Sequence, residues 1–258
     1  TSSDKGAEMI SVLNLSHRFG RADVLNNINL EIPKGELTAL IGPNGAGKST
    51  LLSLIARLEP MQSGRITVDD MDIGTCDTKL ISQKLSILPQ VPEIGSRLSV
   101  QELVAFGRYP YHRGRPNEED RQRVEKAIEV FDLVPFAKRA LDTLSGGQRQ
   151  RALLAMTYAQ DTDYMLLDEP LNNLDIEASR SLMANLKNLA TAHNKTIVIV
   201  LHDINYAASY ADWVVTLKGG SLGPSGKPAD LISSEMLREV FNTDAAVHII
   251  KGKPLVEV

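Results

Sequence analysis

The sequence predicts an α/β fold that carries an antiparallel β layer near its N-terminus and a helical insertion in its middle. Residues 37–55 predict the α/β core, because a short apolar run, a glycine-rich loop and a segment with helical spacing follow one another. A period-two pattern between residues 9 and 36 predicts the antiparallel layer. Helical patterns on both sides of a loop rich in glycine and proline predict the insertion, at about residues 91–160.

Length and composition favour one compact unit with subdomains. The chain has 258 residues, of which 43% are hydrophobic, enough for a sizeable core. We expect the polar residues 1–8 to be a tail without ordered structure and residues 9–258 to form a single domain. The net charge of −4 and the lack of a dense lysine or arginine run argue against nucleic acid as the main partner. The one cysteine, Cys76, excludes an internal disulfide, and no apolar stretch approaches the roughly 20 residues of a membrane span.

The N-terminal strands are predicted from alternation. Ile28, Leu30 and Ile32 alternate with polar residues, and Arg65 to Asp69 repeats the pattern. Between the first strands lies Phe19, which could stack on a nucleotide base or serve as an ordinary core phenylalanine.

The glycine-rich loop matches the phosphate-binding pattern G-x-x-x-x-G-K-S/T at every fixed position. It consists of Gly42, Pro43, Asn44, Gly45, Ala46, Gly47, Lys48, Ser49 and Thr50. The apolar run 37–41 before it predicts a buried strand, and Leu51, Leu54, Ile55 and Leu58 after it predict a helix. In this context the backbone N–H groups and the helix N-terminus bind phosphate. We expect Lys48 to reach the β- and γ-phosphates and Ser49 to bind Mg²⁺.

The insertion contains two predicted helix starts and a second candidate anion site. Ser99 with Glu102 is a possible capping box, residues 107–116 are predicted as a loop, and residues 118–131 as an amphipathic helix. A further capping box, Ser145 with Gln148, precedes a helix predicted over 149–159. Capping does not need the intervening pair Gly146 and Gly147, whose bare backbone at a helix start favours anion binding.

Two acidic residues end the next apolar strand, predicted over 164–168. Asp168 can hold Mg²⁺ directly or through water, and Glu169 can orient or deprotonate an attacking water. The alternative, two solvated acids at a strand end, is less favoured beside a phosphate loop. Asp175 is placed to cap the following helix, and capping alone could explain it.

The last core strand is predicted over residues 196–201 and is followed by His202. A histidine at the end of a buried parallel strand lies on the edge where α/β sheets bind ligands. Residues 214–220 predict a hairpin, and residues 229–258 predict a small α/β appendage without chemistry of its own.

With these segments in this order, the chain resembles the ATP-binding cassette (ABC) ATPases, from about Met9 to Ser225. The most specific match is residues 144–148, LSGGQ, the signature of that family. The resemblance implies a P-loop NTPase core with an N-terminal antiparallel β subdomain and a helical signature-motif subdomain. It also implies ATP hydrolysis with ATP and Mg²⁺ as ligands. The positions that it carries over are Phe19 for adenine stacking, Gln90 for Mg²⁺ and the attacking water, Asp168 for the Mg²⁺ site, Glu169 as general base, Asp175 in a loop that crosses the dimer interface, and His202 for the γ-phosphate.

The resemblance further implies partners. Two subunits would pack head to tail, so that Ser145 and Gly147 of one close over ATP held by Lys48 of the other. A transmembrane permease would bind near Gln90 and the helical insertion. Indirectly, a substrate-binding protein would deliver cargo, and the chain would lie peripherally on the cytoplasmic face of the membrane.

Two segments resemble one branch of that family, the bacterial importers of ferric siderophores, haem and vitamin B12. They are residues 106–110 and residues 169–175, where Leu171, Asn172 and Asn173 replace the small residues of the general form. Ferric siderophores are favoured as the commonest cargo of the branch. A haem or vitamin B12 importer and an ABC exporter remain the alternatives.

Overall fold

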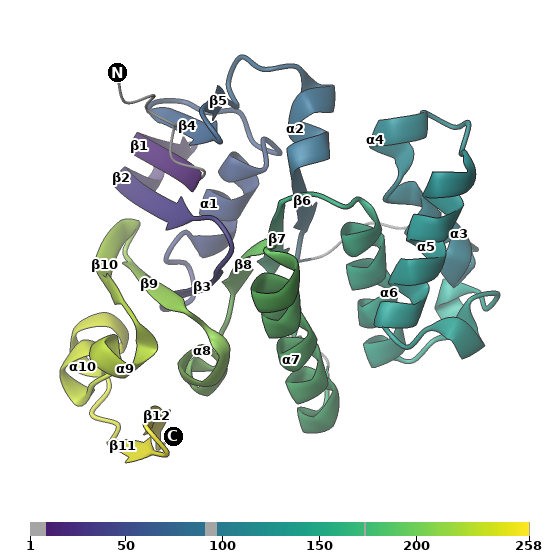
Figure 1. Ribbon diagram of the computed structural model, residues 1–258. Coiled ribbons are helices and arrows are strands. Elements are labelled where there is room, and N and C mark those ends of the chain that lie inside the picture. The colour runs from purple at the N-terminus through teal and green to yellow at the C-terminus, as the bar shows by residue number, and fades with distance from the viewer. Residues whose placement is uncertain (1–8, 91–96, 173, 258) are drawn as a thin grey trace, which may run out of the picture.

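The structure is a computed structural model that describes residues 9–90, 97–172 and 174–257. The predicted tail 1–8, the start of the predicted insertion at residues 91–96, and Asn173 lie outside the described residues. Within that range the fold is α/β with an antiparallel layer and a separate group of helices, as predicted (Figure 1). Among the same residues, no helix combines the length and apolar composition needed to cross a bilayer.

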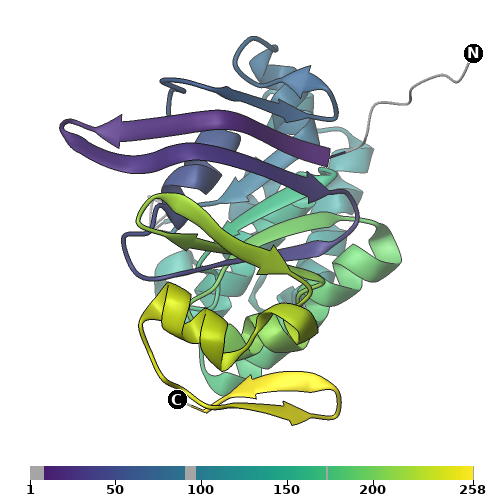
Figure 2. The same ribbon diagram turned by 90° about the vertical axis from the view of Figure 1, so that its left-hand side faces the viewer.

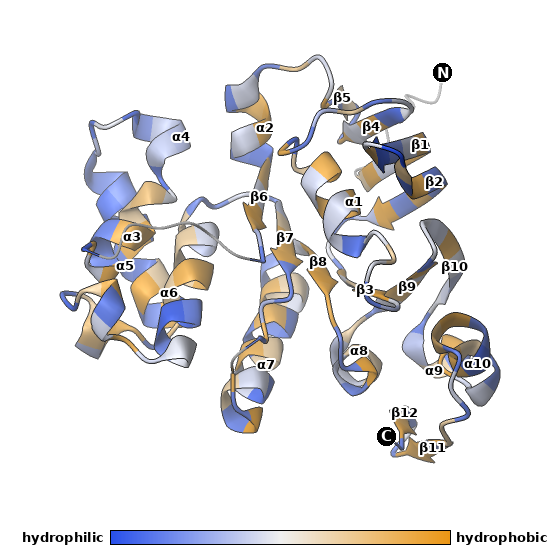
Figure 3. Ribbon diagram, turned by 180° about the vertical axis from the view of Figure 1, so that it is seen from behind, coloured by the Kyte–Doolittle hydropathy of each residue, from blue (hydrophilic) through white to orange (hydrophobic). Residues whose placement is uncertain are grey.

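The central sheet has the strand order β10-β9-β3-β8-β7-β6. Its strands are β3 (Leu37–Ile41), β6 (Leu85–Leu88), β7 (Tyr164–Asp168), β8 (Thr196–Val200), β9 (Trp213–Lys218) and β10 (Ser221–Gly226). β9, β3, β8, β7 and β6 pair in parallel, and β10 closes one edge as the predicted hairpin with β9. Every residue of β3, β7 and β8 is buried, because both faces of the sheet are covered (Figure 3). Their carboxyl ends therefore meet at one edge of the molecule.

A second, antiparallel sheet has the order β2-β1-β4-β5. It consists of β1 (Met9–Phe19), β2 (Ala22–Pro33), β4 (Arg65–Val68) and β5 (Met71–Asp72). Helix α1 (Lys48–Ile55) packs between the two sheets, and Leu51, Leu54 and Ile55 are buried there. Leu58, predicted on the same face, is 55% exposed, because α1 ends at Ile55 and the chain turns at Arg57 with a φ of 58°. The sheet and the parallel strands thus hold the start of α1 from both sides.

The group of helices lies on the far side of the central sheet from α1 (Figure 1). It contains α3 (Val100–Phe106), α4 (Tyr109–His112), α5 (Glu118–Val130) and α6 (Gly146–Ala159). The capping boxes predicted at Ser99 and Ser145 are both present. One prediction was wrong: residues 107–116 are not wholly a loop, because α4 forms one turn in which Pro110 occupies an early position that needs no N–H donor.

The remaining helices cover the central sheet and build the C-terminal part. They are α2 (Thr78–Lys84), α7 (Ile176–His193), α8 (Ile204–Tyr210), α9 (Pro228–Leu231) and α10 (Ser234–Phe241). The chain then forms a hairpin of β11 (Val247–Ile250) and β12 (Lys253–Val256). Figure 2 shows this hairpin at the end of the molecule opposite β1 and β2.

Candidate functional site

The phosphate-binding loop joins β3 to α1 and is shaped by its glycines. Gly47, immediately before α1, has a φ of 98°, and a Cβ there would lie 2.8 Å from the Val24 carbonyl oxygen of β2. A residue with a side chain would therefore be strained and also collide with the backbone. The loop is fixed before any ligand arrives, with its N–H groups at the start of a helix.

Lys48 is buried inside this loop. Its Nζ donates hydrogen bonds to the carbonyl oxygens of Gly42, at 2.8 Å, and Pro43, at 2.9 Å. Burial lowers the pKa of the Lys48 ammonium, and the nearby carboxylates of Glu169 and Asp168 only partly offset this effect. Because burial disfavours the charged form of Lys48, anionic phosphate oxygens would stabilise this ammonium better than the two carbonyl oxygens do.

Ser49 and Asp168 meet at the carboxyl end of β7. The Ser49 hydroxyl donates a hydrogen bond of 2.9 Å to Asp168 Oδ1. Burial raises the pKa of the Asp168 carboxyl, and the Ser49 hydrogen bond acts against that rise. Two hard oxygen donors, one of them a carboxylate, suit a small divalent cation.

Glu169, directly after β7, is the centre of a hydrogen-bond cluster. Its carboxylate lies 2.6 Å from His202 Nε2 and accepts hydrogen bonds from Gln90 Nε2, at 2.6 Å, and Asn172 Nδ2, at 2.8 Å. Burial opposes ionisation of Glu169, but the bonds to His202, Asn172 and Gln90 outweigh burial and lower its pKa. The backbone is left-handed here, with φ at 51°, which is uncommon for a residue other than glycine. The three polar partners of its carboxylate make Glu169 a candidate functional residue.

These residues come from three neighbouring parallel strands. Gln90 follows β6, Asp168 ends β7 with Glu169 directly after it, and His202 follows β8. The adjacency of these strands brings together residues that are far apart in sequence. The structure therefore brings the phosphate loop, both acids and His202 together, as expected for the carboxyl ends of parallel strands, and adds Gln90, which only the family resemblance had singled out.

Phe19 lies at the end of β1, in the hairpin whose other strand touches the phosphate loop through Val24. Its side chain is 50% exposed, which excludes the core alternative. The ring packs edge to face against buried His17, with the ring centroids 4.8 Å apart. Phe19 thus leaves about half of its surface open to solvent, where it could stack on a base.

The segment Ser145–Gln148 is not part of this cluster. Its helix α6 lies on the other side of β7 and α7 from α1 (Figures 1 and 3). A Cβ on Gly147 would lie 3.3 Å from Leu174, in the turn that leads to α7. Asp175 caps α7 by accepting a hydrogen bond of 2.8 Å from the Ala178 N–H, as predicted. The chain consequently carries two separate helix starts suited to anions, and they do not share one ligand within a single copy.

The contact between Asn172 and Glu169 was missed from sequence. Asn172 was noted only as a feature of one branch of the ABC family. The turn in which the Asn172 N–H bonds the Glu169 carbonyl oxygen, at 3.2 Å, brings the two side chains together. A spacing of three residues after a strand end was the only available signal for this turn.

A glycine loop that opens a helix beside a carboxylate at the end of the neighbouring strand is the arrangement of a P-loop ATPase. Comparison with known proteins defines the group more narrowly. The chain belongs to the ABC transporter family, whose sequence pattern matches residues 25–172. It is accordingly an ATPase that binds ATP.

Individual relatives match this chain in sequence or in structure over most of its length. The petrobactin import ATP-binding protein YclP of Bacillus subtilis (strain 168) is 46% identical over 245 residues, covering 95% of this chain and 97% of that protein. A solved structure described as an inward-facing conformation of a putative metal-chelate type ABC transporter matches with a TM-score of 0.82 and 28% identity, covering 96% of each chain. The dimeric post-hydrolysis state of the ATP-binding cassette MJ0796, bound to ADP and Pi, matches with a TM-score of 0.77 and 30% identity, covering 85% of this chain and 98% of that one.

Proposed function

We propose that this protein is the ATP-hydrolysing subunit of a bacterial ABC importer for ferric siderophores, working as a homodimer on a transmembrane permease. The observation that carries the proposal is the division of the chemistry between two places. One copy holds the phosphate loop and the Glu169 cluster on one edge, whereas its Ser145–Gln148 helix start lies beyond α7. Two copies placed head to tail would complete two equivalent sites.

ATP would be gripped by the phosphate loop of one copy. In this assignment Lys48 binds the β- and γ-phosphates, the N–H groups of residues 42–50 surround them, and Phe19 stacks on adenine. From the partner copy, Ser145 and Gly147 would contact the γ-phosphate, with Gly146, Gln148 and Asp175 in the adjoining backbone. Each nucleotide would then hold two subunits together.

The oxygen donors beside the loop fit Mg²⁺. Ser49 and Asp168 already lie within hydrogen-bond distance of each other, and burial raises the pKa of the Asp168 carboxyl, so that a bound cation would favour its ionised form. We assign the metal to these two residues, with Gln90 nearby. When bound, the ion supplies positive charge to the phosphate oxygens.

Hydrolysis in this proposal depends on Glu169. With its pKa lowered, the carboxylate is ionised at neutral pH and can accept a proton from a water that attacks the γ-phosphorus. The bond from that phosphorus to the β-phosphate oxygen breaks, giving ADP and phosphate. Gln90 orients the same water, and His202 contacts the γ-phosphate while it holds Glu169. Loss of the γ-phosphate removes the contact that joins the two copies, and the dimer opens.

Cargo and location follow from the relatives. One relative is a petrobactin import ATP-binding protein, and one structural match is described as a putative metal-chelate type ABC transporter. We assign ferric siderophores on this basis, with delivery by a substrate-binding protein and a peripheral position at the cytoplasmic face of the membrane through the permease.

Radio-iron uptake tests the cargo. Cells lacking this gene are complemented with wild type, Lys48→Ala, or Lys126→Ala as an exposed lysine control, and are offered several ferric siderophores one at a time. We expect the deletion to abolish uptake of one siderophore class. Wild type and Lys126→Ala should restore that uptake, whereas Lys48→Ala should not. Uptake unaffected by the deletion, in a strain without redundant importers, would remove the siderophore assignment and favour haem or vitamin B12.

Light scattering tests the dimer. The Glu169→Gln variant should bind ATP, hydrolyse it very slowly and shift from monomer to dimer in saturating ATP. The double variant Glu169→Gln/Lys48→Ala is the control that should stay monomeric. A monomeric Glu169→Gln protein in saturating ATP, also when bound to its permease, would contradict the shared site.

A further inference from the structure

The C-terminal hairpin makes an unusual contact with helix α8. The side-chain amide of Asn205, in the first turn of α8, forms two hydrogen bonds with the backbone of Val256 in β12. Nδ2 donates to the Val256 carbonyl oxygen at 3.1 Å, and the Val256 N–H donates to Oδ1 at 2.8 Å. The amide thus satisfies both backbone groups of one strand residue, as a neighbouring strand would.

A third hydrogen bond ties the other end of the same helix to the same strand. Lys253 Nζ donates to the carbonyl oxygen of Ser209, near the C-terminal end of α8, at 2.5 Å. Val256 is 4% exposed and packs with Ala207 and Ala208 of α8 in the main hydrophobic core. The hairpin therefore holds α8 at both ends and along its buried face.

Helix α8 begins at Ile204, directly after the capping residue that follows the histidine of the site. Asp203 caps it by accepting a hydrogen bond of 2.8 Å from the Asn205 N–H, and His202 is the residue before Asp203. The His202 side chain is 42% exposed, so packing alone does not fix its ring. Its position depends on its bond to Glu169 and on where α8 starts. Asn205 links that start to strand β12, 51 residues further along the chain.

We propose that the C-terminal hairpin positions His202 for ATP hydrolysis through the Asn205–Val256 pair. Asn205 is then a positioning residue, because its side chain bonds the backbone of Val256 and it would act through the histidine. A shift of α8 by a fraction of an ångström would misplace His202 relative to the γ-phosphate and Glu169, and small misplacements are costly in rate. This inference rests on the proposed role of His202 in hydrolysis.

A double-mutant cycle between Asn205 and His202 tests the inference. Single-turnover ATP hydrolysis is measured with the full chain for wild type, Asn205→Ala, His202→Ala and the double variant. We expect Asn205→Ala to lower the rate about ten-fold in the wild-type background, with the KM for ATP nearly unchanged, and less than about two-fold in the His202→Ala background. Lys253→Met should show the same dependence on His202 with a smaller effect. His248→Ala is the matched control, because the side chain of this hairpin residue contacts exposed Glu257 and not α8 in the described interactions.

The outcomes separate this inference from the proposed function. Equal losses for Asn205→Ala in both backgrounds would show that the hairpin acts independently of His202 and would overturn the inference. No loss for His202→Ala itself would instead remove the histidine from the proposed mechanism. NMR of the His202 ring covers the case in which a variant is poorly folded. Its resonances should shift in Lys253→Met but not in His248→Ala, and unchanged resonances in a folded Lys253→Met protein would also overturn the inference.

Discussion

The two ends of strand β7 carry the same residue types in opposite electrostatic situations. At the carboxyl end, burial raises the pKa of Asp168 and lowers that of Lys48, so both charged forms are disfavoured. At the amino end, burial acts on Asp163 and Lys84 in the same directions, but hydrogen bonds and ion pairs outweigh it. The pKa of Asp163 is lowered and that of Lys84 is raised.

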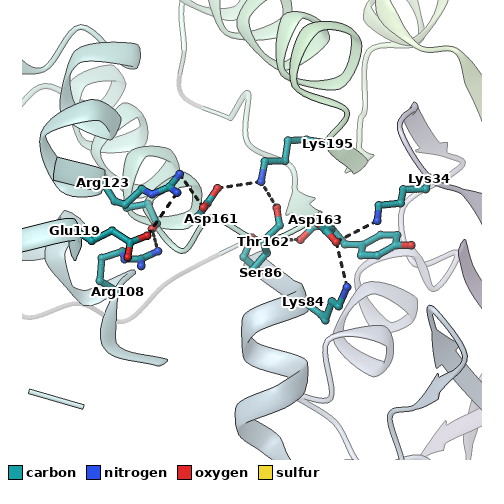
Figure 4. Close-up of polar contacts among 12 residues, drawn as sticks. Lys34, Lys84, Ser86, Arg108, Glu119, Arg123, Asp161, Thr162, Asp163 and Lys195 are labelled. Carbon is teal, nitrogen blue, oxygen red and sulfur yellow. Dashed lines mark hydrogen bonds and ion pairs between the residues drawn. The ribbon is translucent and has the colours of Figure 1, made fainter. Parts of the chain in front are cut away.

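The difference arises from how many cationic partners bond the carboxylates at each end of β7. Asp163 accepts hydrogen bonds from Lys34, at 3.1 Å, and Lys84, at 3.2 Å (Figure 4). Its neighbour Asp161 is held by Lys195, at 3.1 Å, and by Arg123 of α5, at 2.9 Å, which ties the group of helices to the sheet. The amino end therefore stabilises the fold, whereas the carboxyl end keeps charges that a phosphate and its cation would compensate.

The largest expected effect is on turnover at the carboxyl end. Glu169→Gln should lower the rate of ATP hydrolysis by about 10²–10⁴-fold, because the amide cannot accept a proton from water. The free energy of unfolding should change by less than about 1 kcal/mol, since the amide fills the same space. Steady-state ATPase assays and urea unfolding measure both quantities. Asp163→Asn is the matched control, with hydrolysis expected within about three-fold of wild type. Similar rate losses in the two variants would contradict the claim that only the carboxyl end of β7 takes part in hydrolysis.

A buried ion pair in the group of helices should show how strongly the cost of losing one partner depends on burial. The Arg108 and Asp120 side chains are 4% and 3% exposed and lie 3.0 Å apart within the group of helices. Arg108→Met strands a buried carboxylate and should cost about 3–5 kcal/mol of unfolding free energy, measured in urea. Adding Asp120→Asn should recover part of that loss. Lys84→Met, at a pair more exposed to solvent, should cost under about 1 kcal/mol, and an equal cost at both positions would contradict the role of burial.

The sequence predicted the carboxyl end far better than the amino end. The phosphate loop, the acids at the end of an apolar strand and His202 follow from local patterns, because each motif is contiguous and parallel strands align their carboxyl ends. The network around Asp161 and Asp163 joins residues up to 129 positions apart, and no local pattern encodes such pairings. The same holds for Asn205 and Val256, whose contact depends on how the hairpin folds back onto α8. The turn α4 was missed because Pro110 within it and the flanking Gly107 and Gly114 dominate the local signal.

Asparagine substitutions at the two ends of β7 should change stability in opposite directions. Asp168→Asn removes a carboxylate that is disfavoured in the nucleotide-free protein, so the protein should gain about 1 kcal/mol, or roughly 2–4 °C in Tm. Asp163→Asn removes a carboxylate held by two ammonium groups and should lower Tm by a similar or smaller amount. Differential scanning calorimetry without nucleotide measures both shifts. With ATP and Mg²⁺ the gain from Asp168→Asn should disappear, because wild type alone then binds the cation well; shifts of the same sign without nucleotide would contradict the comparison.

The smallest expected effect is on the pH dependence of stability, to which the carboxylates at the two ends of β7 contribute with opposite signs. Asp163 has a pKa below its unfolded value of about 3.9, so its contribution is present above that pH and is lost as the pH falls through its folded pKa. The raised pKa of Asp168 has the opposite sign, and its destabilising effect is relieved as acid protonates the folded carboxyl. The raised pKa of Lys84 matters only in alkaline solution. The free energy of unfolding is measured in urea between about pH 6 and 3. Asp163→Asn should be less stable than wild type and Asp168→Asn more stable at the upper end of this range, and both differences should shrink toward zero as the pH falls. For Asp163 the change should stay below about 1 kcal/mol, because its side chain is 38% exposed and solvent screens the pair. Curves that stay parallel to wild type across this range would show that neither carboxyl titrates differently in the folded protein.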